Sequence, residues 1–211
     1  MAYDLEEQEQ LAALKAWWKD NGTLVLVAIA AAAIAFAGWQ GWNRWKDGQS
    51  QQAATLYEAL LKALVAGDAK AMREPGGELA EKFPSSLYAS MGALAQARFY
   101  FDRKDLKNAK AQLQWAVEHA GSGELRDVAR LRLAGVLVDE KSYDEALKLL
   151  EAKHSPALEA QYAALRGDAL VAKNRPDEAK AAYRTALEKA DGGRSPGLRE
   201  SVQMRLDALG G

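Results

Sequence analysis

The residues that could carry out catalysis are few and scattered along this chain. It contains two histidines, His119 and His154, and no cysteine, so it offers neither a thiol nucleophile nor thiolate ligands for a metal. His119 falls near the end of a predicted helix and His154 in a turn before Ser155-Pro156, where an imidazole can bond to free backbone carbonyl groups. We therefore assign both histidines structural or surface roles.

Adjacent acidic residues are the second group with chemical potential. The pairs Asp139-Glu140, Asp144-Glu145 and Asp177-Glu178 lie at the ends of predicted helices. The last two lie at helix starts, where carboxylates interact favourably with the helix dipole. The sequence contains no phosphate-binding loop, dinucleotide fingerprint, nucleophile elbow or zinc-protease motif. We expect no cofactor, no metal site and no enzymatic activity of this chain alone.

The most informative feature is an uncharged stretch from Asn21 to Asn43. As a helix, the residues from Thr23 to Trp42 would extend about 30 Å, the thickness of the hydrocarbon core of a bilayer. Large apolar side chains in this stretch contribute roughly −2 to −4 kcal/mol to membrane insertion, which is favourable but modest. They are Leu24, Val25, Leu26, Val27, Ile29, Ile34 and Phe36. We interpret residues 21–43 as a transmembrane helix.

Tryptophans flank the uncharged stretch on both sides. Amphipathic indole rings favour the level of the lipid headgroups, where one end of the ring is apolar and the other wet. Of the 6 tryptophans in the chain, all but one lie here. We predict that they anchor the helix in membrane lipid: Trp17, Trp18, Trp39, Trp42 and Trp45.

The two other interpretations of the stretch are a signal peptide and a buried core helix. Ala35-Phe36-Ala37 followed by Gly38 resembles the cleavage site of a signal peptide, but the leading segment is long and acidic where a signal peptide is short and positive. A buried core helix is the other interpretation. A helix that is apolar all round needs a large core around it, and the rest of this chain is too amphipathic to provide one.

The flanking charges do not decide the orientation of the helix. Lys15 and Lys19 precede it, Arg44 and Lys46 follow it, and acidic residues contribute little to the positive-inside rule. The whole chain has a formal net charge of −1, with basic residues spread evenly. It therefore lacks the basic surface that nucleic acids require, and we expect no nucleic-acid partner.

Beyond Gly48 the chain is predicted to be all-α and repetitive. Apolar residues recur there at three-to-four spacing, without alternating β-branched runs. Three similar segments, residues 105–109, 142–146 and 175–179, each stand between two amphipathic helices and end in alanine. These alanines are 37 and 33 positions apart, which brackets the tetratricopeptide period of about 34 residues.

Matching positions around each alanine support the repeat. Small residues lie twelve positions before it (Ala97, Ala134 and Gly167), and large ones lie nine before (Tyr100, Leu137 and Leu170) and four after (Leu113, Leu150 and Tyr183). A small residue on the first helix lets the second approach closely, so that hairpins can stack. This pattern predicts a tetratricopeptide-like α-solenoid of about three helical hairpins; the alternative is a helical bundle in which the alanines recur by coincidence.

Opening and capping helices should cover the two ends of the solenoid, since terminal apolar faces need cover. We place an opening helix at residues 51–67 with Leu56, Leu60, Leu61 and Leu64 in its apolar stripe. The capping helix, residues 198–209, would bury Leu198, Val202, Leu206 and Leu209. The expected domains are an acidic tail (1–20), the transmembrane helix (21–43), a linker with opening helices (44–86) and the tetratricopeptide-like domain with its capping helix (87–211).

The first helices of such hairpins line a concave face, and their side chains are our candidate binding surface. Most of them are apolar, which suits hydrophobic segments or a partner helix. Arg98 is the one basic residue in the set, so capture of a terminal carboxylate by a basic cluster is disfavoured. Alternatively, the opening or capping helix covers these side chains. The predicted face comprises Met91, Leu94, Arg98, Phe101, Val128, Leu131, Val138, Gln161, Ala164, Asp168 and Val171.

The arrangement of these parts resembles the ancillary SecYEG translocon subunit family, the YfgM-like proteins of Gram-negative bacteria. The resemblance lies in Trp-Trp-Lys-Asp-Asn-Gly at 17–22, the end of the span at 38–43, and residues 131–134, 165–170 and 203–205. It implies a single-pass protein of the bacterial inner membrane, with a cytoplasmic N-terminus and a periplasmic domain. It also implies association with the SecYEG translocon and a PpiD-like periplasmic chaperone.

Such a protein would be a non-enzymatic accessory that passes newly translocated chains, including secretory and outer-membrane client proteins, to periplasmic chaperones. The alternative is a membrane-anchored scaffold or regulator of an envelope complex or of a stress response.

Overall fold

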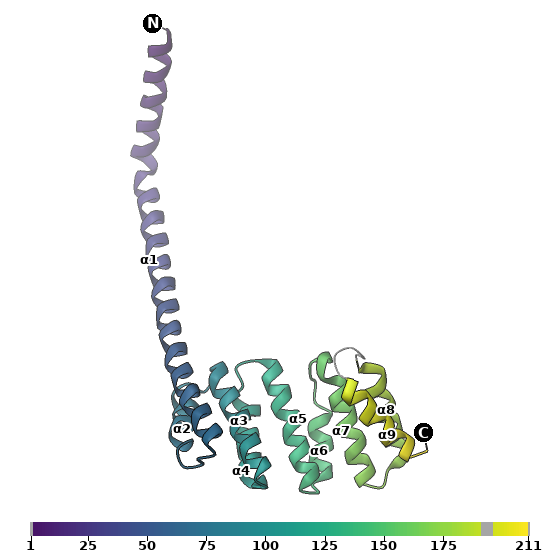
Figure 1. Ribbon diagram of the computed structural model, residues 1–211. Helices are drawn as coiled ribbons and strands as arrows, with labels where there is room; N and C mark the ends of the chain where they lie inside the picture. The colour runs from purple at the N-terminus through teal and green to yellow at the C-terminus, as the bar shows by residue number, and fades with distance from the viewer. Residues whose placement is uncertain (1, 191–195, 211) are drawn as a thin grey trace. The chain divides into compact units, whose positions relative to one another are not determined.

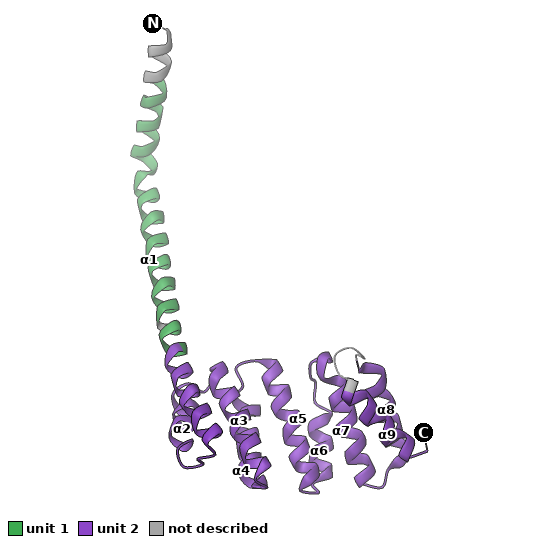
Figure 2. Ribbon diagram, viewed as in Figure 1, with its two compact units in different colours: residues 1–50 green, residues 51–211 purple. Residues whose placement is uncertain are grey.

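The computed structural model describes residues 2–190 and 196–210. The chain divides into two compact units, residues 1–50 and 51–211 (Figure 2). All regular structure in the described residues is helical, as the sequence predicts. The first helix, α1 (Ala2–Ala66), contributes residues to both units.

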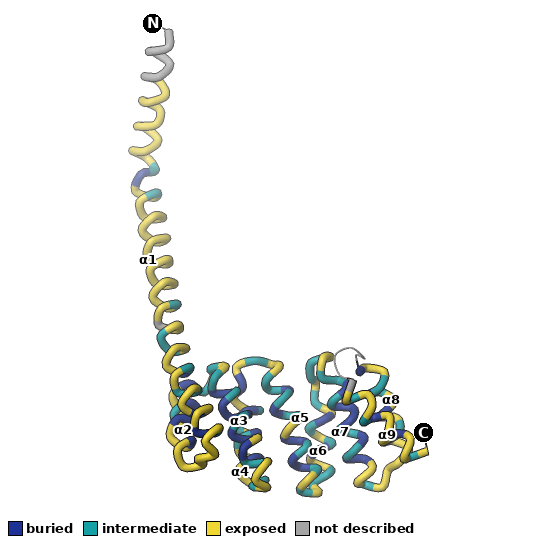
Figure 3. Tube along the Cα trace, viewed as in Figure 1, coloured by how far each residue is buried: buried dark blue, intermediate teal, exposed yellow. Residues whose placement is uncertain are grey.

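In the first unit, α1 exposes nearly all the side chains that the structure describes (Figure 3). Leu24 and Ile34, for example, are 73% and 74% exposed. Within the described residues, this is the helix whose length and composition allow it to cross a membrane. Large apolar side chains without protein partners are stable in the hydrocarbon of a bilayer, where the helix also satisfies its own backbone hydrogen bonds.

The second unit is a row of helical hairpins (Figure 1). Its opening elements are the last turns of α1 and α2 (Arg73–Lys82), and its closing element is α9 (Pro196–Ala208). Between them lie the three hairpins that the repeat predicts. They are formed by α3 (Leu87–Asp102) with α4 (Leu106–His119), α5 (Gly123–Asp139) with α6 (Tyr143–Leu150), and α7 (Glu159–Ala172) with α8 (Pro176–Lys189); a short 3-10 helix, η1 (Pro156–Leu158), precedes α7.

The same backbone turn joins the two helices of each hairpin. Five positions before each closing alanine, a non-glycine residue has a left-handed backbone: Lys104, Lys141 and Asn174, with φ of 62°, 64° and 58°. The next N–H donates to a carbonyl five residues back, from Asp105 to Tyr100 (3.0 Å), Ser142 to Leu137 (2.8 Å) and Arg175 to Leu170 (2.9 Å). This Schellman pattern satisfies the carbonyls at the end of the first helix and redirects the chain into the second.

The hairpins pack through pairs of one small and one large residue. Ala97 and Ala134 are buried, as are their large partners Leu113 and Leu150. The third hairpin has Gly167 instead, where an added β-carbon would lie 2.3 Å from Cε1 of Tyr183. The tyrosine ring therefore occupies the space where a β-carbon on residue 167 would lie.

The opening helix differs from the expected stripe at one position. Leu60 is fully buried and Leu56 and Leu64 pack against the same core, but Leu61 is 37% exposed. Leu60 lies at the centre of the buried stripe, and Leu61, about 100° further around the helix, falls outside it. Ala53, Tyr57 and Ala63 complete the buried stripe in place of Leu61.

The closing helix packs as predicted. Val202 and Leu206 of α9 are buried with residues of α7 and α8, and Leu198 and Leu209 pack against the same cluster.

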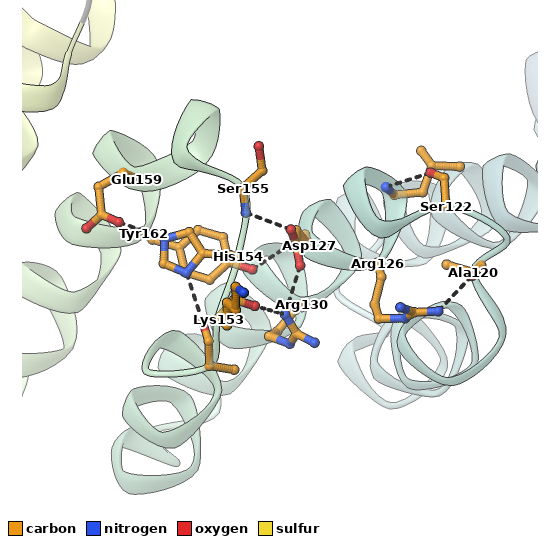
Figure 4. A network of polar contacts seen from close by, with 12 residues as sticks. Ala120, Ser122, Arg126, Asp127, Arg130, Lys153, His154, Ser155, Glu159 and Tyr162 are labelled. Atoms are coloured by element: carbon orange, nitrogen blue, oxygen red, sulfur yellow. Dashed lines mark hydrogen bonds and ion pairs between the residues drawn. The ribbon is translucent and has the colours of Figure 1, made fainter.

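A polar network connects α5 to the segment that leads into α7 (Figure 4). The buried carboxylate of Asp127 accepts hydrogen bonds from the backbone N–H of Ser155 (2.8 Å) and from Arg130 (2.9 Å). The hydroxyl of Tyr162 donates to the Asp127 carbonyl (2.8 Å), and the His154 ring stacks on Tyr162 with 3.8 Å between centroids. His154 thus supports the junction between the second and third hairpins.

Candidate functional site

A groove of about 460 Å³ lies along the C-terminal halves of α3, α5 and α7, the first helices of the hairpins. Its volume falls within the range of pockets that enclose a few side chains or a small ligand, roughly 300–1,000 Å³. The lining residues are Ala97, Arg98, Phe101, Leu113, Arg132, Gly135, Val136, Val138, Asp139, Leu165 and Asp168.

Apolar residues make up most of the groove. Leu113 and Val136 are buried beneath it, and Phe101, Val138 and Leu165 pack partly buried against the same core. Gly135 leaves open space, since a β-carbon added there would meet no atom within 4 Å apart from its own helix and neighbours. The lining is therefore shaped to receive apolar side chains.

The charged residues of the groove differ in whether they have partners. Arg98 donates to Asp102 one turn later (2.8 Å). Asp168 accepts hydrogen bonds from Tyr183 (2.7 Å) and Arg205 (2.8 Å). Among the described residues, no hydrogen bond or ion pair is found for the side chain of Arg132 or for that of Asp139.

Arg132 is exposed on α5, but its guanidinium is partly desolvated. This partial burial lowers the pKa of the guanidinium, and the charge of Arg98 adds to the effect. The two arginines line the same groove, although they come from different hairpins.

The structure brings together four residues of the predicted concave face in this groove: Arg98, Phe101, Val138 and Asp168. The others lie elsewhere. Leu94 and Ala164 are buried in the core, Val128 and Leu131 pack half-buried against it, Met91 and Gln161 are half-buried on α3 and α7, and Val171 is exposed.

Sequence reasoning missed several lining residues, of which Arg132 and Gly135 matter most. Gly135 lies eleven positions before its closing alanine, as Arg98 and Asp168 do in their hairpins, so the repeat register could have identified it. Arg132 occupies the same repeat position as Leu165, because each lies fourteen positions before the closing alanine of its hairpin. An arginine at a position that is apolar in the next hairpin is the signal that could have identified Arg132 as a groove residue.

The predicted membrane anchors lie on α1 in the first unit. Trp17, Trp18, Trp39 and Trp42 are all exposed there, and Trp17 and Trp18 contact each other with 6.5 Å between ring centroids. The side chain of Trp45 lies outside the described residues. Anchoring by these tryptophans stays a prediction.

The fold and the groove define a class: a tetratricopeptide-like helical protein that has, within its described residues, one N-terminal helix long and apolar enough to cross a membrane. Residues 15–211 match the tetratricopeptide repeat-like domain family. The chain also belongs to the family of ancillary SecYEG translocon subunits.

Three relatives of that name show this membership. The chain is 30% identical to the ancillary SecYEG translocon subunit of Neisseria gonorrhoeae, covering 99% of this chain and 100% of the relative. It is 32% identical to the protein from Aggregatibacter actinomycetemcomitans, with 99% and 100% covered. For the Escherichia coli protein the identity is 30%, with 96% of each chain covered.

Proposed function

We propose that this protein is a non-enzymatic accessory subunit of the Sec translocon whose groove holds segments of other polypeptides. The observation that carries the proposal is the mostly apolar groove across α3, α5 and α7, in a chain whose full-length relatives are named ancillary SecYEG translocon subunits. Tetratricopeptide-type arrays use such surfaces formed by several repeats for binding.

The location that fits this function is the bacterial inner membrane, with the N-terminus in the cytoplasm and the second unit in the periplasm. There the groove would meet newly translocated secretory and outer-membrane client proteins, and a PpiD-like periplasmic chaperone to which it passes them. A reporter enzyme that is active only outside the cytoplasm, fused after Gly211, tests the orientation. A well-expressed but inactive fusion would overturn the periplasmic assignment.

Photo-crosslinking tests the groove. A photoreactive amino acid at Phe101 or Val138, both in the groove lining, should trap translocating clients or the chaperone in cells. Gln114 is the matched control, because it is exposed on α4 and does not line the groove. Labelling from Phe101 and Val138 that is no stronger than labelling from Gln114 would contradict the proposal.

A groove-filling substitution provides a second test. Gly135→Leu places a branched side chain in the open space of the groove. We expect this variant to fold and to lose crosslinking from Val138. Gly77→Leu is the control, since Gly77 is an exposed residue of α2 whose β-carbon position is also free of neighbours. Equal crosslinking in the two leucine variants would show that the client does not occupy the groove.

A further inference from the structure

Arg132 is an exposed residue of α5 that lines the groove and forms no hydrogen bond or ion pair with any described residue. The neighbouring arginine, Arg98, pairs with Asp102, and the carboxylate of Asp168 is engaged by Arg205 and Tyr183. Arg132 makes no such bond to any described residue, although it lines the same groove. Its guanidinium therefore presents its N–H donors to whatever enters the groove.

We propose that the groove selects apolar polypeptide segments that carry an acidic side chain, whose carboxylate pairs with Arg132. This inference rests on the proposed function of the groove and names the chemistry of its ligand. It also differs from the sequence-based expectation, in which Arg98 was the one basic residue of the binding face.

Guanidinium chemistry favours a carboxylate at this place. Arginine presents N–H groups in a planar fork that matches the two oxygens of a carboxylate, and such charge-assisted bonds are among the stronger ones in proteins.

The surroundings of Arg132 explain why the acidic group should belong to an apolar segment. Phe101, Val138 and Leu165 line the same groove, and Gly135, nearly one helical turn beyond Arg132 on α5, leaves space above the backbone. Apolar ligand side chains that fill this space would exclude water, and an ion pair is stronger where the local dielectric is low.

Asp139 sets the direction of the ligand. It lies seven residues after Arg132 on α5, about 10 Å along the helix axis, at the end where the helix dipole is negative. The groove therefore has, among the described residues, an unpaired cation at Arg132 and an anionic end at Asp139. The ligand carboxylate is expected on the first of these and is repelled from the second.

Peptide binding to the full chain in lipid nanodiscs tests the inference. The probe is a short fluorescent peptide of leucine, valine and serine with one central glutamate, and sister peptides carry glutamine or lysine in its place. We expect fluorescence anisotropy to show the glutamate peptide binding about tenfold more tightly than the glutamine peptide, with the lysine peptide weakest. Arg132→Gln should remove this preference, and Arg132→Glu should invert it in favour of lysine.

Arg184→Gln is the matched control, because Arg184 is an exposed arginine of α8 that does not line the groove. It should keep the preference for glutamate. One possible result is that the glutamate and glutamine peptides bind equally well and that Gly135→Leu abolishes the binding of both. This result would overturn the selection for acidic segments but not the proposed function of the groove. Peptide binding that Gly135→Leu does not change, or no binding of any peptide, would overturn both proposals.

Discussion

At the scale of single residues, packing in this protein depends on matched sizes across each hairpin. In the first two hairpins, Ala97 and Leu113, and Ala134 and Leu150, are buried in the same core cluster. The third uses Gly167 with Tyr183, whose ring stands where a β-carbon on residue 167 would be. The tyrosine is buried and its hydroxyl is held by Asp168, so the ring cannot easily move aside.

Gly167→Ala should therefore destabilise the domain. Overpacking of this kind costs about 1–3 kcal/mol, which urea unfolding followed by circular dichroism can measure. The substitution should cost less in a Tyr183→Leu background, because that pair copies the alanine and leucine of the other hairpins. Gly135→Ala is the control and should be neutral or stabilising, since its added methyl group meets open space. A loss in Gly167→Ala no larger than in this control would contradict the packing account.

Tyr183 also makes the stability depend on pH. Burial, and then its hydrogen bond to Asp168, raise the pKa of its hydroxyl above the ordinary value of 10.0. Below that value the hydroxyl is protonated in both the folded and unfolded chain, and its contribution to stability is fully present. Above it the unfolded chain loses the proton first, so the free energy of unfolding falls by up to about 1.4 kcal/mol per pH unit.

Tyr183→Phe should reduce this loss. We expect unfolding in urea at about pH 9 and pH 11 to show a smaller decrease for the variant than for the parent chain. Tyr162, whose pKa is also raised by burial, is present in both proteins and cancels in the comparison. The same decrease in both proteins would exclude Tyr183 as its source.

At the scale of elements, the three hairpins share a left-handed turn that their residue types do not predict. Glycine is the usual residue for a left-handed backbone, but two of the three positions here are lysines, Lys104 and Lys141. A left-handed conformation costs an ordinary L-residue about 1–2 kcal/mol. The Schellman hydrogen bonds and the packing of the hairpin hold these residues in place despite that cost.

Lys141→Gly should stabilise the domain by about 0.5–1 kcal/mol, because relief of the left-handed backbone exceeds the added entropy of the unfolded chain. The midpoint of thermal unfolding measures the change. Lys62→Gly is the matched control: Lys62 is an exposed lysine inside α1, where glycine should instead cost about 1 kcal/mol. Destabilisation by Lys141→Gly would show that its side chain contributes more than the conformational cost.

At the scale of the whole molecule, the free energy of inserting the candidate membrane helix into a bilayer is only modestly favourable. Its large apolar residues supply roughly −2 to −4 kcal/mol, and one lysine at the centre of a span costs about 2.5–3.5 kcal/mol. Small residues occupy much of the span, as its central run of alanines shows.

Ile34→Lys should therefore release much of the protein from the membrane. Ile34 is exposed on α1 near the middle of the uncharged stretch. Alkaline carbonate extraction followed by centrifugation measures the fraction that stays in the membrane. Leu11→Lys, at an exposed apolar position before the stretch, should remain integrated like the parent. An unchanged membrane fraction for Ile34→Lys would show that other contacts hold the protein there.

Regular patterns of residues along the chain explain which elements of the fold could be predicted from the sequence. The uncharged stretch, the alanines at repeat spacing and the apolar stripe of the closing helix are local patterns, and each led to the element that the structure contains. The prediction that Leu61 is buried was wrong, because Leu60 and Leu61 are both leucines and the sequence does not distinguish them. Only the rotation of the helix against the core decides which of the two is buried.

The all-α class, the candidate membrane-spanning helix and the three hairpins could be predicted from the sequence, because each depends on the spacing of residues along one helix or one repeat. The tertiary structure alone decided the groove. Arg98, Arg132 and Leu165 come from three different hairpins, and Gly135 becomes an opening only when those hairpins stack. Contacts between repeats depend on helix rotation and on the sizes of distant side chains, and no spacing within one repeat contains that information.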